Sequence, residues 1–275
     1  MHVKIAKMIS GITASAGLIG SNISHSLSPF IHNFLASKLK IDTVYTAHNV
    51  CSSHLKSAIF GAQALGFYGL NITTPHKIAV MDFVDKLDET AQNVQSVNLV
   101  KFNNEQLIGF NTDVYGILQS LNRSGITNIN KATIYGAGGA SRSAIQALKQ
   151  LGCKEFTIIN RTRKNAESLI NYIEKTNSAT ATLSDKPING DIFIQTSSAL
   201  PGELMHIIPD NYSFVLDLNY HKHNQWLEHL HSLKINSSDG LIMLVFQAIR
   251  AFEILWDAAV TQDVSNDLIK KVLSI

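Results

Sequence analysis

Three polar clusters in the first half of the chain carry side chains that could act on a small molecule. Ser26 and Ser28 stand just before a proline, and their hydroxyls beside a helix N-terminus could hold a carboxylate. Lys77 ends the run Asn-Ile-Thr-Thr-Pro-His-Lys, and Asp113 ends the run Gly-Phe-Asn-Thr-Asp. A lysine ammonium can stabilise a developing negative charge and donate a proton, and a nearby carboxylate favours its charged form.

Each of these residues also has an ordinary interpretation when it is taken alone. Ser28 followed by Pro29 is typical of a helix start, with the serine as N-cap. An isolated lysine is usually an exposed surface residue. Asp113 precedes another helical pattern, where an acidic residue favours the first turn.

A glycine-rich turn in the second half has the form of a dinucleotide-binding site. Residues 136–141 read Gly-Ala-Gly-Gly-Ala-Ser between a predicted strand and a predicted helix. The first glycine permits a tight turn, the second lets the backbone approach a pyrophosphate, and Ser141 is small enough for close helix–strand packing. The helix N-terminus would offer free N–H groups to the phosphates.

The end of the next strand indicates which dinucleotide is bound. Residues 160–164 read Asn-Arg-Thr-Arg-Lys, about 20 residues past the turn, where an NAD enzyme usually has an acidic residue. A guanidinium binds a 2′-phosphate that a carboxylate would repel. The sequence therefore favours NADP over NAD.

These groups must be positioned by strands and helices that alternate along most of the chain. We expect strands at 16–20, 43–50, 69–74, 131–136, 155–160, 191–195 and 213–218, and helices at 28–40, 53–65, 140–151, 165–175 and 239–257. Apolar runs around Asn103 and Asn104 predict a hairpin between residues 98 and 110. This alternation predicts an α/β protein with mostly parallel sheets covered by helices on both faces.

Composition limits the classes of partner and compartment. The 275 residues include 23 Lys and Arg against 21 Asp and Glu, so no global field favours nucleic acid or membranes. Lys4 and Lys7 precede a segment too interrupted to be a signal peptide, and we expect a cytoplasmic protein. Cys51 and Cys153 suggest packed, reduced thiols. The histidines have no metal-ligand spacing, so no metal is expected.

Taken in order, the motifs resemble the shikimate dehydrogenase family. They are Gly-x-Ile-Gly-x-x-Ile-x-His-Ser-Leu-Ser-Pro from Gly17, Asn-Ile-Thr-x-Pro-His-Lys, Asn-Thr-Asp, Gly-Ala-Gly-Gly-Ala-Ser-Arg, Asn-Arg-Thr and a closing Asp-Gly-Leu-Ile-Met-Leu-Val-x-Gln. The resemblance runs from about Gly17 to Phe252 and implies reversible NADPH-dependent reduction of 3-dehydroshikimate to shikimate, in aromatic amino-acid biosynthesis.

The resemblance also implies roles for individual residues. Lys77 and Asp113 would be the catalytic pair, with Lys77 as proton donor. The substrate would be bound by Ser26, Ser28, Thr73, Asn98, Tyr220 and Gln247. NADP would be bound by Gly136, Ala137, Gly138, Gly139, Ala140, Asn160, Arg161, Thr162, Arg163, Gly240 and Met243.

The same resemblance implies two domains with a cleft between them. Residues 1–115, joined by returning C-terminal helices at 241–275, would form an N-terminal α/β substrate domain. Residues 116–240 would form a Rossmann-type doubly wound NADP-binding domain, with the polar stretch 122–130 at the connection. The substrate is the only partner we expect, and the protein would be a monomer or a homodimer.

Several positions depart from the family pattern. Val114 and Ile242 replace glycines near expected ligand positions, where they could narrow the pocket, and Leu99 replaces a threonine, so one hydroxyl is lost. Gln195 begins a Gln-Thr-Ser-Ser segment that departs from the family pattern. The pattern therefore does not predict which residues of this segment contact the nicotinamide.

Two alternative functions remain open from the sequence. One is a quinate/shikimate dehydrogenase of broader specificity. The other is a non-catalytic dinucleotide-binding regulator on the same fold, since a fold does not determine its function. Retention of both Lys77 and Asp113 argues against the regulator.

Overall fold

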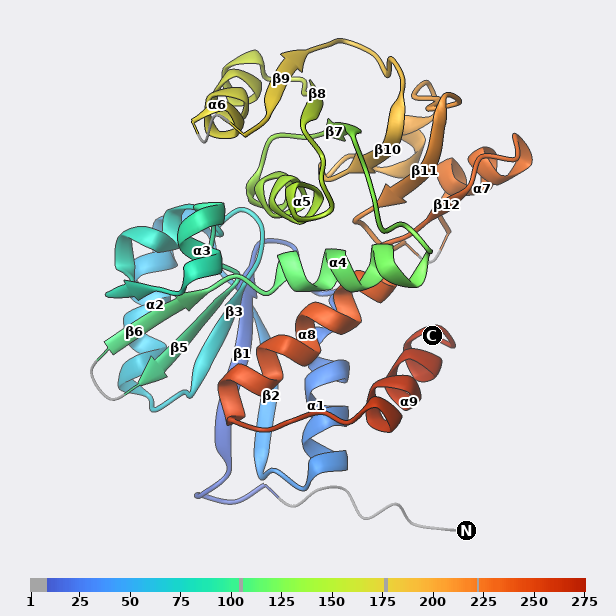
Figure 1. Ribbon diagram of the computed structural model, residues 1–275. Helices are drawn as coiled ribbons and strands as arrows, with labels where there is room; N and C mark the ends of the chain where they lie inside the picture. Colours follow the sequence, from blue (N-terminus) through green and yellow to red (C-terminus); the bar gives the residue numbers. More distant parts are fainter. Residues whose placement is uncertain (1–8, 104–105, 176–177, 222) are drawn as a thin grey trace.

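The protein is built on two separate sheets, one in each half of the chain. The computed structural model describes residues 9–103, 106–175, 178–221 and 223–275. Figure 1 shows the sheet of the first half in the lower part of the molecule and that of the second half in the upper part. We call residues 9–123 with 241–275 the first unit, and residues 131–238 the second unit.

The first sheet is mixed and has the strand order β2-β1-β3-β5-β6-β4. Its strands are β1 (Ala14–Gly20), β2 (Thr43–Asn49), β3 (Gly69–Ile72), β4 (Lys86–Leu87), β5 (Leu99–Asn103) and β6 (Gln106–Phe110). β1 is parallel to β2 and β3, whereas β5 is antiparallel to β3 and β6. The predicted hairpin is therefore confirmed as β5–β6, although Asn104 lies outside the described residues.

The helices of the first unit are α1 (Ser28–Leu39), α2 (Leu55–Ala64), α3 (Glu89–Val94), α4 (Asp113–Arg123), α8 (Leu241–Trp256) and α9 (Gln262–Val272). The expectation that Ser28 caps α1 was wrong. Leu27 occupies the N-cap and Ser28 is the first helical residue. The Oγ of Ser26 instead accepts a hydrogen bond from the Ser28 N–H at 3.2 Å, so the earlier serine satisfies this N–H at the start of the helix.

The second sheet is entirely parallel and confirms the Rossmann-type doubly wound fold. Its order is β12-β11-β10-β7-β8-β9, from β7 (Lys131–Tyr135), β8 (Glu155–Ile159), β9 (Thr180–Leu183), β10 (Gly190–Gln195), β11 (Tyr212–Asp217) and β12 (Ser237–Ser238). Its helices are α5 (Gly139–Gln150), α6 (Arg163–Glu174) and α7 (Gln225–Ser232).

Alternate side chains of β10 enter different cores on the two faces of this sheet. Ile192 and Ile194 belong to the cluster that includes buried residues of α5 and α6. Phe193, between them, belongs to the cluster that includes Trp226 of α7. Because successive side chains of a strand point to opposite faces, helices must cover both sides of the sheet.

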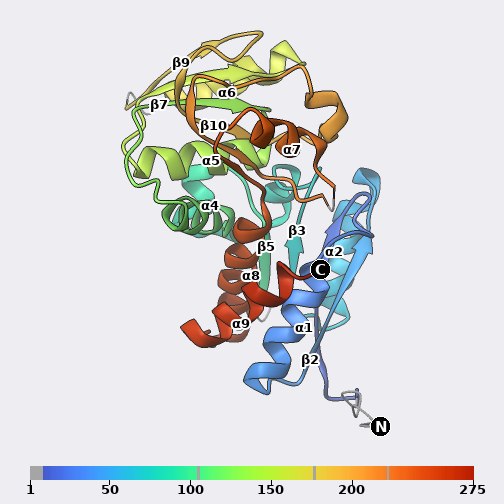
Figure 2. The same ribbon diagram turned by 90° about the vertical axis from the view of Figure 1, so that its right-hand side faces the viewer.

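Helix α8 returns the chain from the second unit to the first. It is largely apolar and packs against α1, α4, α9 and β5. Figure 2 shows α8 and α9 beside α1. At the crossing of α4 and α8, a Cβ on Gly116 would lie 2.6 Å from the Met243 carbonyl oxygen. The two helices therefore approach as closely as a glycine permits.

The two cysteines differ in exposure. Cys153 is buried as expected, but Cys51 is exposed, because it precedes the surface turn 52–54 rather than facing the sheet. Lys4 and Lys7 lie outside the described residues. Within the ranges given above, no helix is long and apolar enough to cross a membrane.

His32 of α1 is a buried imidazole stacked on an aromatic ring. It is 2% exposed, and its ring centroid lies 4.0 Å from that of Tyr45 with an angle of 10° between the planes. Burial lowers the pKa of His32 to about 3. The folded protein therefore holds this ring neutral at pH values at which the unfolded chain would protonate it.

Gly116→Ala should destabilise the protein because the added methyl group would meet the α8 backbone. We expect a loss of about 1–3 kcal/mol in the free energy of unfolding, the usual cost of overpacking a core. Gly61→Ala is the matched control, since a Cβ at this position of α2 meets nothing within 4 Å. Urea unfolding followed by circular dichroism measures both, and equal stabilities of the two variants would contradict the close crossing.

His32→Phe should make stability less sensitive to acid. Below about pH 6.5 the unfolded wild type gains a proton at His32 that the folded state refuses until about pH 3, so its free energy of unfolding falls. Between pH 7 and pH 5 the wild type should lose about 2 kcal/mol relative to the variant. Exposed His206, changed to Phe, is the control and should leave the pH dependence as in wild type.

Candidate active site

Lys77 and Asp113 form an ion pair where two segments of the first unit meet. Lys77 follows the loop after β3, and Asp113 is the first residue of α4. The Lys77 Nζ lies 2.6 Å from Asp113 Oδ2, with side-chain exposures of 15% and 3%. The carboxylate is thus almost removed from water, while the ammonium keeps some access. The predicted pair is brought together.

Asn98, Thr112 and Gln247 form a polar network against this pair. The Asn98 Nδ2 donates to Asp113 Oδ1 at 2.8 Å and to Thr112 Oγ1 at 2.9 Å. It also lies 3.3 Å from Gln247 Oε1, which reaches in from α8. Asn98 and Gln247 were expected to bind substrate, and the structure places both beside Asp113. Thr112 joins the site although the sequence had given it no role of its own.

Ser26, Ser28 and Tyr220 were expected to surround a carboxylate. Tyr220 lies beside Ser26, and its side chain interacts with the Ser26 hydroxyl and the Leu27 backbone. Burial is the larger effect and raises the pKa of Tyr220, so the phenol stays protonated. Ser28 is 6% exposed at the start of α1. This corner therefore holds hydroxyl donors at a helix N-terminus, the groups that bind a carboxylate.

Thr73 stands in the loop that carries Lys77. Its N–H donates to the Ile19 carbonyl of β1, and its own carbonyl accepts from the His76 N–H at 2.9 Å. These backbone bonds tie the loop to the carboxyl end of the first sheet, where ligands of α/β proteins usually bind.

The glycine-rich turn has the geometry that a pyrophosphate site needs. Gly136 has a φ of 121°, and a Cβ there would lie 2.4 Å from Thr196 Oγ1, so only glycine fits. A Cβ on Gly138 would meet nothing within 4 Å, which leaves its backbone open to a ligand. The Gly138 N–H donates to Ser141 Oγ at 2.9 Å, and Ser141 contacts Thr196 at 2.7 Å. Ala137 and Ala140 are both half-buried in this segment.

The glycine-rich turn also contacts the lysine of the ion pair. A Cβ on Gly139 would lie 3.0 Å from the Cβ of Lys77 and 2.7 Å from Ser96 Oγ. The first residue of α5 therefore packs directly against the lysine of the first unit. A nucleotide held at this turn would lie next to the Lys77–Asp113 pair.

The basic segment after β8 is exposed at the start of α6. Arg161, Thr162 and Arg163 are all exposed, and Asn160 is half-buried, with its Nδ2 donating to the Thr162 carbonyl at 2.8 Å. The Arg163 Nε is paired with Glu167 at 2.9 Å. The expected phosphate-binding groups thus face solvent at the carboxyl end of the parallel sheet.

Gly240 and Met243 lie at the start of α8. A Cβ on Gly240 would lie 2.2 Å from the Leu218 carbonyl oxygen, so this glycine lets α8 begin against the end of β11. Met243 is 8% exposed and belongs to the core cluster that includes Val114 and Ile117. Its side chain therefore packs mainly against protein.

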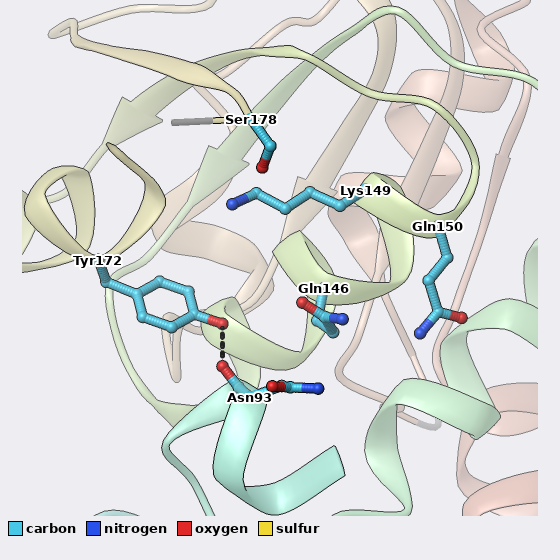
Figure 3. Close-up of a pocket in the computed structure, with 6 residues that line it drawn as sticks. All are labelled: Asn93, Gln146, Lys149, Gln150, Tyr172 and Ser178. Carbon is cyan, nitrogen blue, oxygen red and sulfur yellow. Dashed lines mark hydrogen bonds between the residues drawn. The ribbon is translucent and has the colours of Figure 1, made fainter. Parts of the chain in front are cut away.

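A cavity of about 360 Å³ lies elsewhere, between α3, α5 and α6. Figure 3 shows its polar lining and the bond from Tyr172 Oη to the Asn93 carbonyl, 3.0 Å long, which joins the two units. Neither Lys77 nor Asp113 lines this cavity.

With this geometry in place, comparison with known proteins identifies the family. The family model of the shikimate dehydrogenase substrate-binding domain matches residues 18–100, and that of shikimate/quinate 5-dehydrogenase matches residues 120–201. A shikimate dehydrogenase (NADP(+)) from Caldanaerobacter subterraneus is 36% identical over 261 residues, which cover 90% of this chain and 93% of the relative. The chain belongs to the shikimate dehydrogenase family.

Solved structures of shikimate dehydrogenases have the same fold. One in complex with NADP+ gives a TM-score of 0.83 at 30% identity and covers 97% of this chain and 98% of the other. Another, from Listeria monocytogenes in complex with shikimate and NAD, gives 0.80 at 29% identity and covers 98% and 100%.

Three departures from the shikimate dehydrogenase pattern lie in apolar cores. Leu99 packs in the cluster with Ala16 and Tyr45, and Val114 packs in the cluster with Met243. Ile242 is partly buried against the cluster that includes residues of α1. Each of these side chains therefore contributes to an apolar core, and the narrowing of a ligand pocket by Val114 and Ile242 stays a prediction. Gln195 is buried and hydrogen-bonded to Ser197, which fixes its own segment.

Sequence reasoning missed Asn111 as a residue of the site. Its Oδ1 accepts from the Asp113 N–H at 3.1 Å and from the Val114 N–H at 3.4 Å, so it binds the first two N–H groups of α4 from the residue before the Thr112 N-cap. The available signal was an asparagine two residues before an expected helix start, a residue type favoured for capping.

Proposed function

We propose that the protein catalyses the reversible NADPH-dependent reduction of 3-dehydroshikimate to shikimate, in the biosynthesis of chorismate and aromatic amino acids. The chain is an oxidoreductase of a family whose members are named for NADP. The observation that carries the proposal is the Lys77–Asp113 ion pair packed against Gly139 of the dinucleotide turn. In this proposal, that packing brings Lys77, as proton donor, next to the cofactor.

Lys77 is the proposed proton donor. NADPH, when bound, supplies the hydride that reduces the ketone. Lys77 stabilises the negative charge that develops on the carbonyl oxygen and transfers a proton to it from Nζ. In the oxidative direction, neutral Lys77 accepts the proton of the shikimate hydroxyl. Asp113 holds the ammonium in position through its 2.6 Å contact.

The proposed substrate contacts follow from donor and acceptor types. Ser26, Ser28 and Tyr220 bind the carboxylate through hydroxyl donors, while Thr73, Asn98 and Gln247 bind ring hydroxyls. The first unit then acts as the substrate domain and the second unit as the NADP domain, and the boundary expected after residue 115 moves to the end of α4 at Arg123. Tyr220 comes from the second unit but lies beside Ser26 and the start of α1, so the proposed carboxylate site draws on both units.

The proposed cofactor contacts use the turn and the basic segment. Gly136 to Ala140 receive the pyrophosphate at the N-terminus of α5, and Asn160 to Arg163 receive the 2′-phosphate. Gly240 and Met243 lie toward the nicotinamide. Support comes from the open backbone at Gly138 and the three exposed cations that follow β8.

Lys77→Met should abolish most activity while leaving a folded, NADP-binding protein. Loss of the proton donor should lower kcat at least about 100-fold, within the usual range for general acid–base catalysis. Absorbance at 340 nm with shikimate and NADP+ measures the rate, and calorimetry with NADP+ verifies the binding site. Exposed Lys86→Met is the control. A kcat within twofold of wild type would refute the assignment, and faster turnover of quinate in wild type would favour the broader enzyme.

Arg161→Ser should weaken NADP+ far more than NAD+. Loss of a charge-assisted contact to the 2′-phosphate should raise KM for NADP+ about 10- to 100-fold. The KM for NAD+, which lacks this phosphate, should change less than threefold. Lys175→Ser, at the opposite end of the same helix, controls for general loss of positive charge. Equal effects on the two cofactors would rule out a phosphate contact.

A further inference from the structure

Asn111 stands between the helix of the dinucleotide turn and the ion pair. Asn111 is 5% exposed, and both the oxygen and the nitrogen of its carboxamide form hydrogen bonds. The oxygen accepts hydrogen bonds from the first two N–H groups of α4, those of Asp113 and Val114. The orientation of the helix start, and with it the direction of the Asp113 carboxylate, therefore depends on where the Asn111 side chain is held.

The amide nitrogen of Asn111 makes two further contacts. It donates to the Ser96 carbonyl at 2.8 Å and to the Ser143 hydroxyl at 3.2 Å. The residue after Ser96 binds the loop of the lysine, since the Val97 N–H donates to the Lys77 carbonyl at 2.8 Å. Asn111 thus connects to both members of the ion pair, to Asp113 directly and to Lys77 through residues 96–97.

Ser143 brings the helix of the dinucleotide turn into this network. It lies in α5, one turn after Gly139, and is fully buried. Its hydroxyl is 3.3 Å from Asn111 Oδ1 and 3.4 Å from the Gly139 carbonyl. A buried polar bond between two rigid segments fixes their relative position more tightly than apolar contact, because either partner left unpaired would cost its full desolvation.

We propose that Ser143 and Asn111 are positioning residues that hold the N-terminus of α5 in register with the Lys77–Asp113 pair. The inference rests on the proposed function, in which the hydride comes from a nucleotide at this turn and the proton from Lys77. Reaction requires both donors to be aligned with one carbonyl group, so a small relative displacement lowers the rate. The Ser143–Asn111 contact opposes that displacement.

Another hydrogen bond between the two units provides a control for the Ser143–Asn111 contact. Tyr172 Oη donates to the Asn93 carbonyl at the cavity shown in Figure 3. Like Ser143, Tyr172 uses one hydroxyl to join the second unit to the first. Unlike Ser143, it has no hydrogen bond to Asn111, Asp113 or Lys77 among the described residues. Its removal should loosen the interface without disturbing the alignment.

The test compares Ser143→Ala with Tyr172→Phe, each of which deletes a single hydroxyl. We expect Ser143→Ala to lower kcat for reduction about fivefold, with KM values for 3-dehydroshikimate and NADPH within twofold of wild type. The primary deuterium isotope effect, measured with NADPH deuterated at nicotinamide C4, should rise because hydride transfer becomes slower relative to product release. Tyr172→Phe should keep both kcat and the isotope effect, whatever its effect on thermal stability.

A double-mutant cycle with Asn111→Ala tests the contact itself. In the Asn111→Ala background, Ser143→Ala should no longer change kcat, since its partner is already absent. If Ser143→Ala behaves like Tyr172→Phe in kcat and isotope effect, the positioning role is wrong while the proposed function stands. If the wild type oxidises neither shikimate nor quinate, the proposed function itself fails.

Discussion

The ion pair between Lys77 and Asp113 is the interaction on which the rest of the site depends. Removing two charges from water is costly. Their attraction compensates for this cost only when the two groups are close together and their other hydrogen-bonding atoms also have partners. Here Asp113 Oδ2 receives the ammonium at 2.6 Å and Oδ1 receives the Asn98 amide at 2.8 Å. Asp113 also stands at the N-terminus of α4, where the helix dipole favours negative charge. The fold must therefore bring Lys77, Asn98 and Asp113, which lie in three separate segments, into contact.

Close contact between backbones brings these segments together. Gly116 lets α4 lie against α8, which carries Gln247 into the polar network, and Gly139 lets α5 lie against Lys77. A side chain at either position would push apart elements that need contact. Because α8 returns from the second unit and α4 leads toward it, the same two helices that complete the site also link the units.

Much of this arrangement could be predicted from local patterns. The glycine-rich turn, the hairpin and the buried parallel strands have strong signals, because backbone conformation and hydrophobic periodicity depend on neighbouring residues. Lys77 and Asp113 were identified from their motifs. Side-chain partners were harder, since they depend on long-range packing. Nothing local indicates that Ser26 would satisfy the α1 start in place of Ser28, or that Leu99 and Val114 would face apolar cores.

The hydrogen-bonding capacity of Asn98 distinguishes its proposed role from that of Gln247. An amide nitrogen has two hydrogens, but Asn98 Nδ2 faces three acceptors, Thr112 Oγ1 at 2.9 Å, Asp113 Oδ1 at 2.8 Å and Gln247 Oε1 at 3.3 Å. The two shorter contacts use both hydrogens, so the Gln247 oxygen is left with a long contact from the Thr112 hydroxyl, at 3.5 Å, and can accept a further hydrogen bond. A substrate hydroxyl donating there would complete the network without breaking a bond to Asp113. Of these two proposed ligands of ring hydroxyls, Gln247 therefore has the freer acceptor, whereas Asn98 also holds the Asp113 carboxylate toward Lys77.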